Sequence, residues 1–257
     1  MKFNNFLNEL WVEGGIRRND NILLHSNMAP LLFKLKKKKF IFKVEDILFN
    51  LINYLGPSGS LILPAFFFKF SEKKFFSRLK TKSEMGKLSE IALNEFPYKR
   101  TWHPVYSFIV IGNVPESEIL KKNYSALGKD SIFNWLLQVN GKIAILDLND
   151  QNSMTFYHFI EELNQVSYRE FKNLKGSYED WGNEKYKVDA KIFVRKKNIL
   201  TDVHNMEKIL WENNCYNAAK KFNYSGLRSC NMNKVKIEVE KIINKNKAEG
   251  ILYNLCK

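Results

Sequence analysis

Short apolar runs alternate with stretches of helical periodicity along most of the chain. The runs that have the composition of buried strands, each bounded by polar or turn-forming residues, are 20–26, 60–64, 108–112 and 142–148. The stretches in which apolar residues recur at helical spacing are 44–55, 84–96 and 132–139, together with a helix that Asn152 or Ser153 caps and that runs to about residue 163. Strands that alternate with helices favour an α/β fold with a mixed, largely parallel sheet flanked by helices.

The pattern is weaker in the last third of the chain. Residues 165–200 are less regular, with a strand expected at 191–195, and residues 203–222 and 233–246 read as helices. We find no internal repeat and no linker rich in Pro, Gly or Ser. The simplest prediction is therefore a single domain that spans residues 1–257.

The net charge of the chain limits the classes of molecule that it is expected to bind. Lys and Arg number 41 against 27 Asp and Glu, so the formal net charge is +14. Such a field attracts nucleic acid, an anionic membrane surface or phosphorylated small molecules. The abundance of Lys, Asn, Ile and Phe is equally what an AT-rich gene encodes, so codon usage is a second explanation for the lysines.

Two basic stretches follow predicted strand ends. Residues 34–43 carry six lysines and no acid, and residues 69–82 carry six basic residues with Glu72 as their one acid. They are either solvated loops or a rim that attracts phosphate, because α/β sheets bind ligands beyond their strand ends.

Several classes of protein are disfavoured. No apolar run approaches the roughly 20 residues that span a bilayer, and no apolar segment of a secretory signal follows Lys2. Three cysteines without metal-type spacing are typical of reduced thiols, so we expect a cytoplasmic protein. The phosphate-binding loop of NTPases, the dinucleotide-binding glycine motif and a serine nucleophile elbow after a strand are all absent from the sequence.

The sharpest chemical motif is T-x-x-H-x-x-E at Thr155, His158 and Glu161, at the start of a predicted helix. His158 and Glu161, three residues apart, lie on one helical face within hydrogen-bonding reach. A carboxylate on one imidazole nitrogen fixes the tautomer and supports a positive charge, as a general base requires. An ordinary surface His–Glu pair is the alternative. A zinc site needs more ligands, and His25, His103 and His204 form no second half-motif, so we predict no metal.

Read together, several segments resemble the antibiotic N-acetyltransferase family, whose best-known members are the aminoglycoside 3-N-acetyltransferases. In chain order they are GIRRNDNILLHSN (15–27), LGPSGSLILPAF (55–66), MGKLSE (85–90), WHPVYS (102–107), LG with Ser131 (127–131), GKI (141–143), TFYHFIEE (155–162) and VSYR (166–169). The resemblance covers a motif-bearing core of about residues 14–170. It implies the α/β fold of this family, with residues 171–257 contributing helices that pack on the core.

The resemblance also implies an acyl-coenzyme A donor, an amino group on a sugar as acceptor, and direct transfer between them. On that basis His158 is the catalytic base and Glu161 orients it. The coenzyme would be held by Ser26, Asn27, Ser107, Gly128 and Thr155. The acceptor would be bound by His25, Trp102 and His103, although a His-Pro pair such as 103–104 is by itself more typical of a structural loop.

The acceptor has two candidates. Polycationic aminoglycosides call for an acidic cleft, whereas this chain is basic and carries the LKKKK segment (35–39) where the family has a Gly-rich stretch. We therefore expect a nucleotide-linked amino sugar of surface-polysaccharide synthesis, with an aminoglycoside as the alternative; the anionic coenzyme would itself favour a basic cleft. A nucleic-acid-binding module is a distant third reading, because the aromatic residues lie in apolar segments and no nucleic-acid motif is present. The sequence leaves the oligomeric state open.

Overall fold

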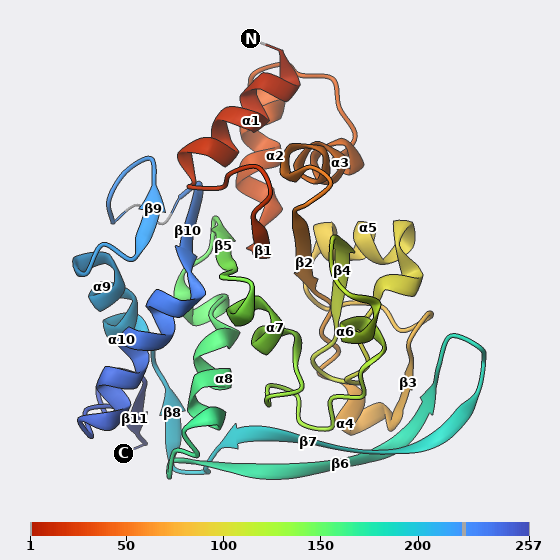
Figure 1. Ribbon diagram of the computed structural model, residues 1–257, viewed down its shortest axis with the longest axis vertical. Coiled ribbons are helices and arrows are strands. Elements are labelled where there is room, and N and C mark those ends of the chain that lie inside the picture. Colours follow the sequence, from red (N-terminus) through yellow and green to blue (C-terminus); the bar gives the residue numbers. More distant parts are fainter. Residues whose placement is uncertain (1, 223–224, 257) are drawn as a thin grey trace.

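A computed structural model describes residues 2–222 and 225–256, and within these ranges six strands form the central sheet. Met1 and Lys257, the ends of the predicted domain, lie outside the described residues. The strand order is β4-β2-β1-β5-β10-β9 (Figure 1). The strands are β1 (Asn21–Ser26), β2 (Ser60–Pro64), β4 (Phe108–Gly112), β5 (Lys142–Leu146), β9 (Tyr216–Ala218) and β10 (Leu227–Asn231).

The sheet is mixed, and its parallel part is the centre. β1 pairs in parallel with β2 and with β5, whereas β4, β10 and β9 all pair antiparallel to their neighbours. The α/β prediction is confirmed, but parallel pairing is confined to three strands instead of running through most of the sheet. Parallel neighbours need a crossover connection that returns the chain to the edge of the sheet where the first strand began. The chain from β2 to β4, and the chain from β5 to β10, instead enter the sheet from the other edge, so these strands pair antiparallel.

Helices cover both faces of the sheet (Figure 1). They are α1 (Phe3–Glu13), α2 (Met28–Lys37), α3 (Val44–Leu55), α4 (Phe70–Lys73), α5 (Lys87–Glu95), α6 (Glu116–Leu120), α7 (Ile132–Gln138), α8 (Thr155–Leu163), α9 (His204–Glu212) and α10 (Met232–Asn244). Successive strand residues point to opposite faces. Ile22 and Leu24 therefore pack in the core under α1 to α3, while Leu23 packs in the core under α7, α8 and α10.

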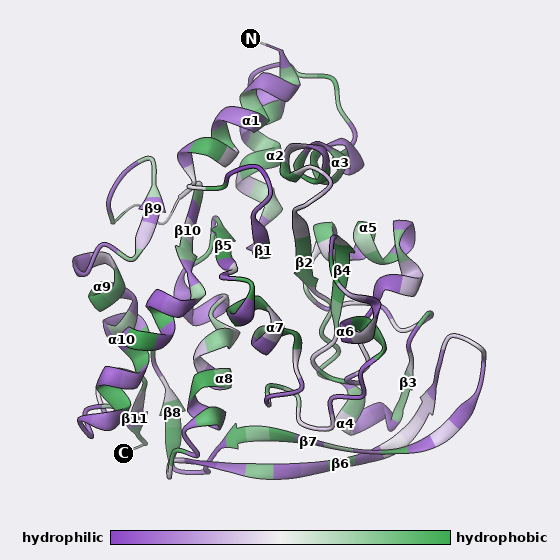
Figure 2. Ribbon diagram, viewed as in Figure 1, coloured by the Kyte–Doolittle hydropathy of each residue, from purple (hydrophilic) through white to green (hydrophobic). Residues whose placement is uncertain are grey.

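A long hairpin runs along one side of the molecule (Figure 1). Its strands are β6 (Arg169–Glu179) and β7 (Lys185–Arg195), and β3 (Phe75–Ser77) pairs in parallel with β6. Hydrophilic residues interrupt the hydrophobic ones along both strands (Figure 2), because one face is largely exposed. The sequence shows no apolar run here for that reason, and the predicted strand 191–195 is only the end of β7.

Other boundaries also differ from expectation. The predicted helix 203–222 ends at Glu212, since residues 216–218 join the sheet as β9. Helix α8 begins at Thr155 with Met154 as N-cap, after a 3-10 turn at Asp150–Asn152, so neither predicted cap residue is used. The first basic stretch is partly helical, because α2 extends to Lys37. The short strands β8 (Ile199–Thr201) and β11 (Tyr253–Leu255) pair with each other. Within the described residues, no helix has the length and apolar character needed to cross a membrane.

Candidate active site

A cavity of about 170 Å³ lies at the ends of β1 and β5, on the side of the sheet covered by α8. Polar side chains reach it from β1 and from the start of α8, and aromatic ones from the segment after β2. Its lining residues are His25, Phe66, Phe68, Met85, Asp150–Thr155, His158, Thr201 and Val203. The structure thus brings three predicted site residues, His25, Thr155 and His158, to one cavity.

Helix α8 is apolar on most of its surface, and Phe156, Tyr157, Phe159 and Ile160 are buried. His158 remains partly accessible, with 22% of its side chain exposed, whereas Glu161 is 1% exposed. Nδ1 of His158 lies 2.7 Å from Oε2 of Glu161, as the three-residue spacing predicts. The other oxygen of Glu161 accepts a hydrogen bond of 2.9 Å from the hydroxyl of Tyr168.

Arg169, the first residue of β6, also contacts this pair. Its Nη2 lies 2.7 Å from Nδ1 and 3.4 Å from Nε2 of His158, and its Nε lies 2.6 Å from Oε2 of Glu161. Nδ1 of His158 can donate to Glu161 or accept from Arg169, but it cannot do both. When Nδ1 donates to Glu161, Nε2 keeps its lone pair, which faces only the long contact of 3.4 Å from Arg169 and can accept a proton.

The charges around His158 set its protonation. Burial lowers the pKa of His158, the positive charge of Arg169 lowers it further, and Glu161 opposes both. Burial alone would raise the pKa of Glu161, but His158, Arg169 and Tyr168 together hold it below its usual value. The site therefore pairs a neutral imidazole with an ionised carboxylate at neutral pH, the combination that general-base catalysis requires.

His25 is 2% exposed, and burial lowers its pKa to about 4, so it is neutral at physiological pH. Its Nε2 lies 3.4 Å from the hydroxyl of Thr155, and its Nδ1 has no hydrogen-bond partner among the described residues. Ser26 and Asn27 follow at the same edge of the sheet but do not line the cavity. Asn27 caps α2, accepting a bond of 3.2 Å from the amide of Ala29.

Trp102, His103 and Ser107 lie in the interior and do not line this cavity. Nδ1 of His103 accepts the amides of Val105 and Tyr106 at 3.1 and 3.0 Å. Ser107 donates to the carbonyl of Ala65 and accepts from Arg100, each at 2.9 Å. The indole of Trp102 donates to the Tyr186 hydroxyl at 2.8 Å, and its ring stacks on Tyr178. These bonds hold the loop before β4, and the binding roles that the resemblance implies for the three residues stay predictions.

Gly128 lines a different cavity, beside Glu162 and Lys191. A Cβ atom at this position would lie 2.9 Å from Oε1 of Glu162 and equally close to Cβ of Ser125. The close approach of Cβ of Ser125 favours glycine here, and Gly128 does not line the cavity of His158.

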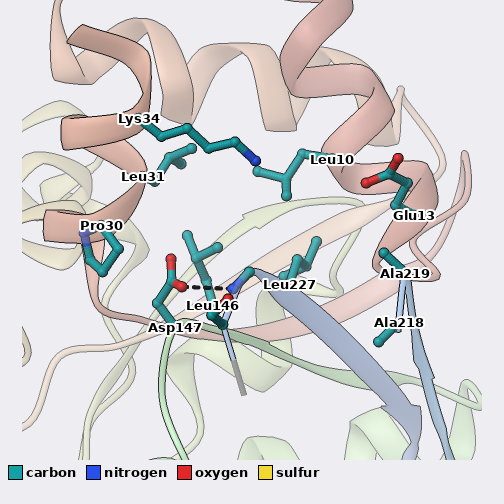
Figure 3. A pocket seen from close by; sticks show the side chains of 12 residues that line it. Leu10, Glu13, Pro30, Leu31, Lys34, Leu146, Asp147, Ala218, Ala219 and Leu227 are labelled. Carbon is teal, nitrogen blue, oxygen red and sulfur yellow. Dashed lines mark hydrogen bonds between the residues drawn. The ribbon is translucent and has the colours of Figure 1, made fainter. Parts of the chain in front are cut away.

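A further cavity, of about 260 Å³, lies on the opposite face of the sheet (Figure 3). It is lined by Leu10, Glu13, Pro30, Leu31, Lys34, Leu146, Asp147, Ala218, Ala219 and 225–227. Lys34 comes from the first basic stretch, and Asp147 accepts a hydrogen bond of 2.6 Å from the amide of Gly226. Burial raises the pKa of Asp147, and Lys34 is among the groups that lower it. One lysine of the predicted phosphate-attracting rim thus faces a cavity.

Two polar residues of the site had no role in the sequence prediction: Asp150, which lines the cavity, and Arg169, which contacts His158 without lining it. Arg169 belongs to the VSYR segment, and its place in a motif indicates a possible role. Nothing in the spacing of the residues predicts its contact with His158. Asp150 had no such signal, because Tyr216 and Arg228 reach it from distant segments. Within the described ranges, no group of three or more His, Cys, Asp and Glu is placed to hold a metal ion.

Comparisons with known proteins identify relatives of this architecture. A family model described as aminoglycoside 3-N-acetyltransferase matches residues 23–239. Curated protein sequences gave no significant match. Similar solved structures include the aminoglycoside acetyltransferase AAC(3)-Xa (14% identity, 94% of this chain and 92% of that chain, TM-score 0.76), AAC-IIIb in binary complex with CoASH (13%, 95% and 96%, 0.72) and YokD from Bacillus subtilis (15%, 95% and 99%, 0.71). At these identities the likeness shows a shared fold.

Proposed function

Because the chain belongs to the aminoglycoside 3-N-acetyltransferase family, and is thus an acyl-coenzyme A-dependent N-acyltransferase, we propose that it acylates an amino sugar with His158 as general base. The contact between Nδ1 of His158 and Oε2 of Glu161, at 2.7 Å beside a cavity, is the observation that carries this proposal. An acceptor amine is an ammonium ion near neutral pH and cannot attack a thioester until it loses a proton. Nε2 of His158 takes that proton, and Glu161 stabilises the imidazolium that forms. A positioned base contributes about 10²–10⁴-fold to the rate.

The cavity is compatible with the donor. Phe66, Phe68 and Met85 give it an apolar wall suited to a narrow aliphatic arm, and the similar AAC-IIIb structure is a complex with CoASH. When bound, acyl-coenzyme A supplies the activated acyl group. We place its phosphates at the sheet edge near Ser26 and Asn27, with Lys34 as a positive charge on the α2 side (Figure 3). Thr155, next to His25, would contact the arm within the cavity.

The family description favours an aminoglycoside as acceptor, and one similar structure, AAC-VIa, is bound to sisomicin (13% identity, 97% of this chain and 100% of that chain, TM-score 0.75). One observation supports a nucleotide-linked amino sugar as the second candidate. Asp150 is the one carboxylate among the described residues that line the cavity, and its oxygens already accept bonds from Tyr157, Tyr216 and Arg228. A polycation would find no free carboxylate there.

Thiol release from acetyl-coenzyme A, with products identified by mass spectrometry, tests the proposal. The acceptors are a panel of 2-deoxystreptamine aminoglycosides and a panel of nucleotide-linked amino sugars. Acetylation of the first panel supports the aminoglycoside reading, and acetylation of the second panel alone supports the other candidate. His158→Gln should abolish transfer, whereas His204→Gln, at an exposed position that does not line the cavity, should not. No acyl transfer to either panel, or normal turnover of His158→Gln, would overturn the proposal.

A further inference from the structure

A buried polar network lies behind the cavity, and Asp150 connects the two. Asp150 lines the cavity but is 1% exposed. Its carboxylate accepts hydrogen bonds from the hydroxyl of Tyr157, from the hydroxyl of Tyr216 at 2.6 and 2.7 Å, and from Nη2 of Arg228 at 3.0 Å. Two phenols and one guanidinium therefore converge on a single carboxylate.

The network continues into the C-terminal part of the chain. Nη2 of Arg228 also donates to Oε1 of Glu207 at 2.9 Å, and its Nη1 donates to the carbonyl of Leu148 at 2.5 Å. The other oxygen of Glu207 accepts the amide of Asp150 at 3.3 Å. Glu207 and Arg228 are 3% and 1% exposed. Removing one member would leave a buried charge without its partner, which is costly, so the groups hold one another in place.

Asp150 also holds the turn that leads into α8. The N-cap residue Met154 makes no side-chain capping bond. The carbonyl of Asp150 accepts the amides of Ser153 and Met154, just before the helix, at 3.0 and 2.9 Å, while its carboxylate accepts a hydrogen bond from Tyr157 within the first turn. Tyr157 directly precedes His158. The backbone of Asp150 thus fixes the turn before α8, and its side chain holds the first turn of the helix that carries the proposed base.

We infer that Asp150 is a positioning residue: through Tyr157 it holds the first turn of α8 so that His158 faces the cavity with Nδ1 at Glu161. This inference rests on the proposed role of His158. Glu207, Tyr216 and Arg228 in turn hold Asp150, which gives the segment from α9 to β10 a part in the site. The position of a base matters because a displacement of about 1 Å can cost 10²-fold in rate.

Two tyrosine variants separate positioning from general stabilisation. Tyr157→Phe and Tyr216→Phe each remove one hydroxyl from the same carboxylate, but only Tyr157 belongs to α8. We expect Tyr157→Phe to lower kcat about tenfold with little change in KM for either substrate. Tyr216→Phe should lower Tm by a similar amount to Tyr157→Phe but should lower kcat less. Tyr54→Phe, whose hydroxyl donates to the carbonyl of Ile16, is the control and should keep full activity. Equal losses of kcat in Tyr157→Phe and Tyr216→Phe would overturn the inference.

A measurement independent of turnover completes the test. Nitrogen NMR of ¹⁵N-histidine-labelled protein reports which nitrogen of His158 is protonated, and the spectrum of His158→Gln assigns its signals. We expect Tyr157→Phe to change the Nδ1 and Nε2 shifts of His158, and Tyr216→Phe to change them less. Unchanged His158 shifts in folded Tyr157→Phe would refute positioning. Should the wild-type protein transfer no acyl group, the proposed function fails, while these spectra still decide whether Asp150 and Tyr157 orient His158.

Discussion

Oε2 of Glu161 lies 2.7 Å from Nδ1 of His158 and 2.6 Å from Nε of Arg169, so one buried carboxylate serves an imidazole and a guanidinium together. The two neighbours of His158 act on it in opposite directions. Glu161 raises its pKa through charge and a hydrogen bond, and Arg169 lowers it through charge. The pH dependence of turnover should therefore respond in opposite directions to removal of either group.

Glu161→Gln should lower kcat about 10²-fold, because the amide no longer supports the positive charge on His158. Without the carboxylate the pKa of His158 falls, so the acid limb of the kcat/KM profile should move to lower pH. Steady-state kinetics between pH 5 and about 9 would measure both effects. Glu162→Gln, the same change one residue along in a carboxylate that bonds Ser125, is the control. An unchanged rate and profile in Glu161→Gln would leave Glu161 a purely structural role.

Arg169→Met should have the opposite effect on the profile. Loss of the positive charge raises the pKa of His158, so more of the imidazole is protonated near neutral pH and the acid limb moves to higher pH. Arg195→Met removes an equal charge from the residue opposite Arg169 in the hairpin, where the side chain donates to the carbonyl of Ile199. The acid limb of the Arg195→Met profile should stay at the pH of the wild type. A profile of Arg169→Met that matches the wild type would contradict the electrostatic role of Arg169.

His103 should make the fold sensitive to acid. Burial lowers its pKa to about 3 from an ordinary value of 6.5. Between these values the unfolded chain binds a proton that the folded protein does not, so stability falls with decreasing pH, by about 1.4 kcal/mol per pH unit. His25, with a pKa of about 4, adds to this slope. Glu207 opposes it, since burial and Asp150 raise its pKa from 4.5 to about 7.

The difference between a variant and the wild type isolates His103 from these other groups. Asn in its place can still accept a backbone amide but does not titrate. We expect His103→Asn to be less stable at pH 7 and to lose less stability between pH 6.5 and about 5 than the wild type, by one proton in the linkage slope. Urea unfolding across this range measures it. Parallel curves for the two proteins would exclude a neutral buried His103 as a source of the slope.

Trp102→Phe should affect stability and spare substrate binding. The change removes the indole bond to Tyr186 and reduces the stacking on Tyr178. We expect a loss of about 1–3 kcal/mol in the free energy of unfolding, with KM for donor and acceptor unchanged. Denaturant unfolding and kinetics at a temperature where the variant is folded provide the comparison. A selective rise in acceptor KM would instead support the binding role of Trp102 that the resemblance implies.

Lys34→Glu should raise KM for acyl-coenzyme A roughly fivefold at low ionic strength, and less in added salt, which screens the charge. Lys37→Glu reverses the same charge on the same helix, but Lys37 does not line the cavity of Figure 3. It should therefore have the smaller effect. Equal effects of the two variants would mean that only the overall positive field attracts the donor.

Local patterns of residues are enough to predict the elements whose signals are local. Buried strands such as β1 and β5 are continuous apolar runs, and α3 shows a clear helical period. The predicted bounds of all three elements agree with the structure within a few residues. The His158–Glu161 contact was also determined locally, because three residues of helix bring the two side chains together whatever surrounds them. The hairpin β6–β7 lacked such a signal, since its exposed face carries polar residues.

Which residues meet around the cavity depends on how distant segments pack together. Arg169 reaches His158 because β6 starts beside α8, and Asp150 meets Tyr216 and Arg228 across 66 and 78 residues of chain. The WHPVYS segment resembles a family motif and contains the polar side chains of Trp102, His103 and Ser107. Packing directs these polar atoms to the backbone and to neighbouring side chains. Local periodicity records how a segment folds, but the approach of distant segments depends on the whole core, and no short pattern in the sequence encodes it.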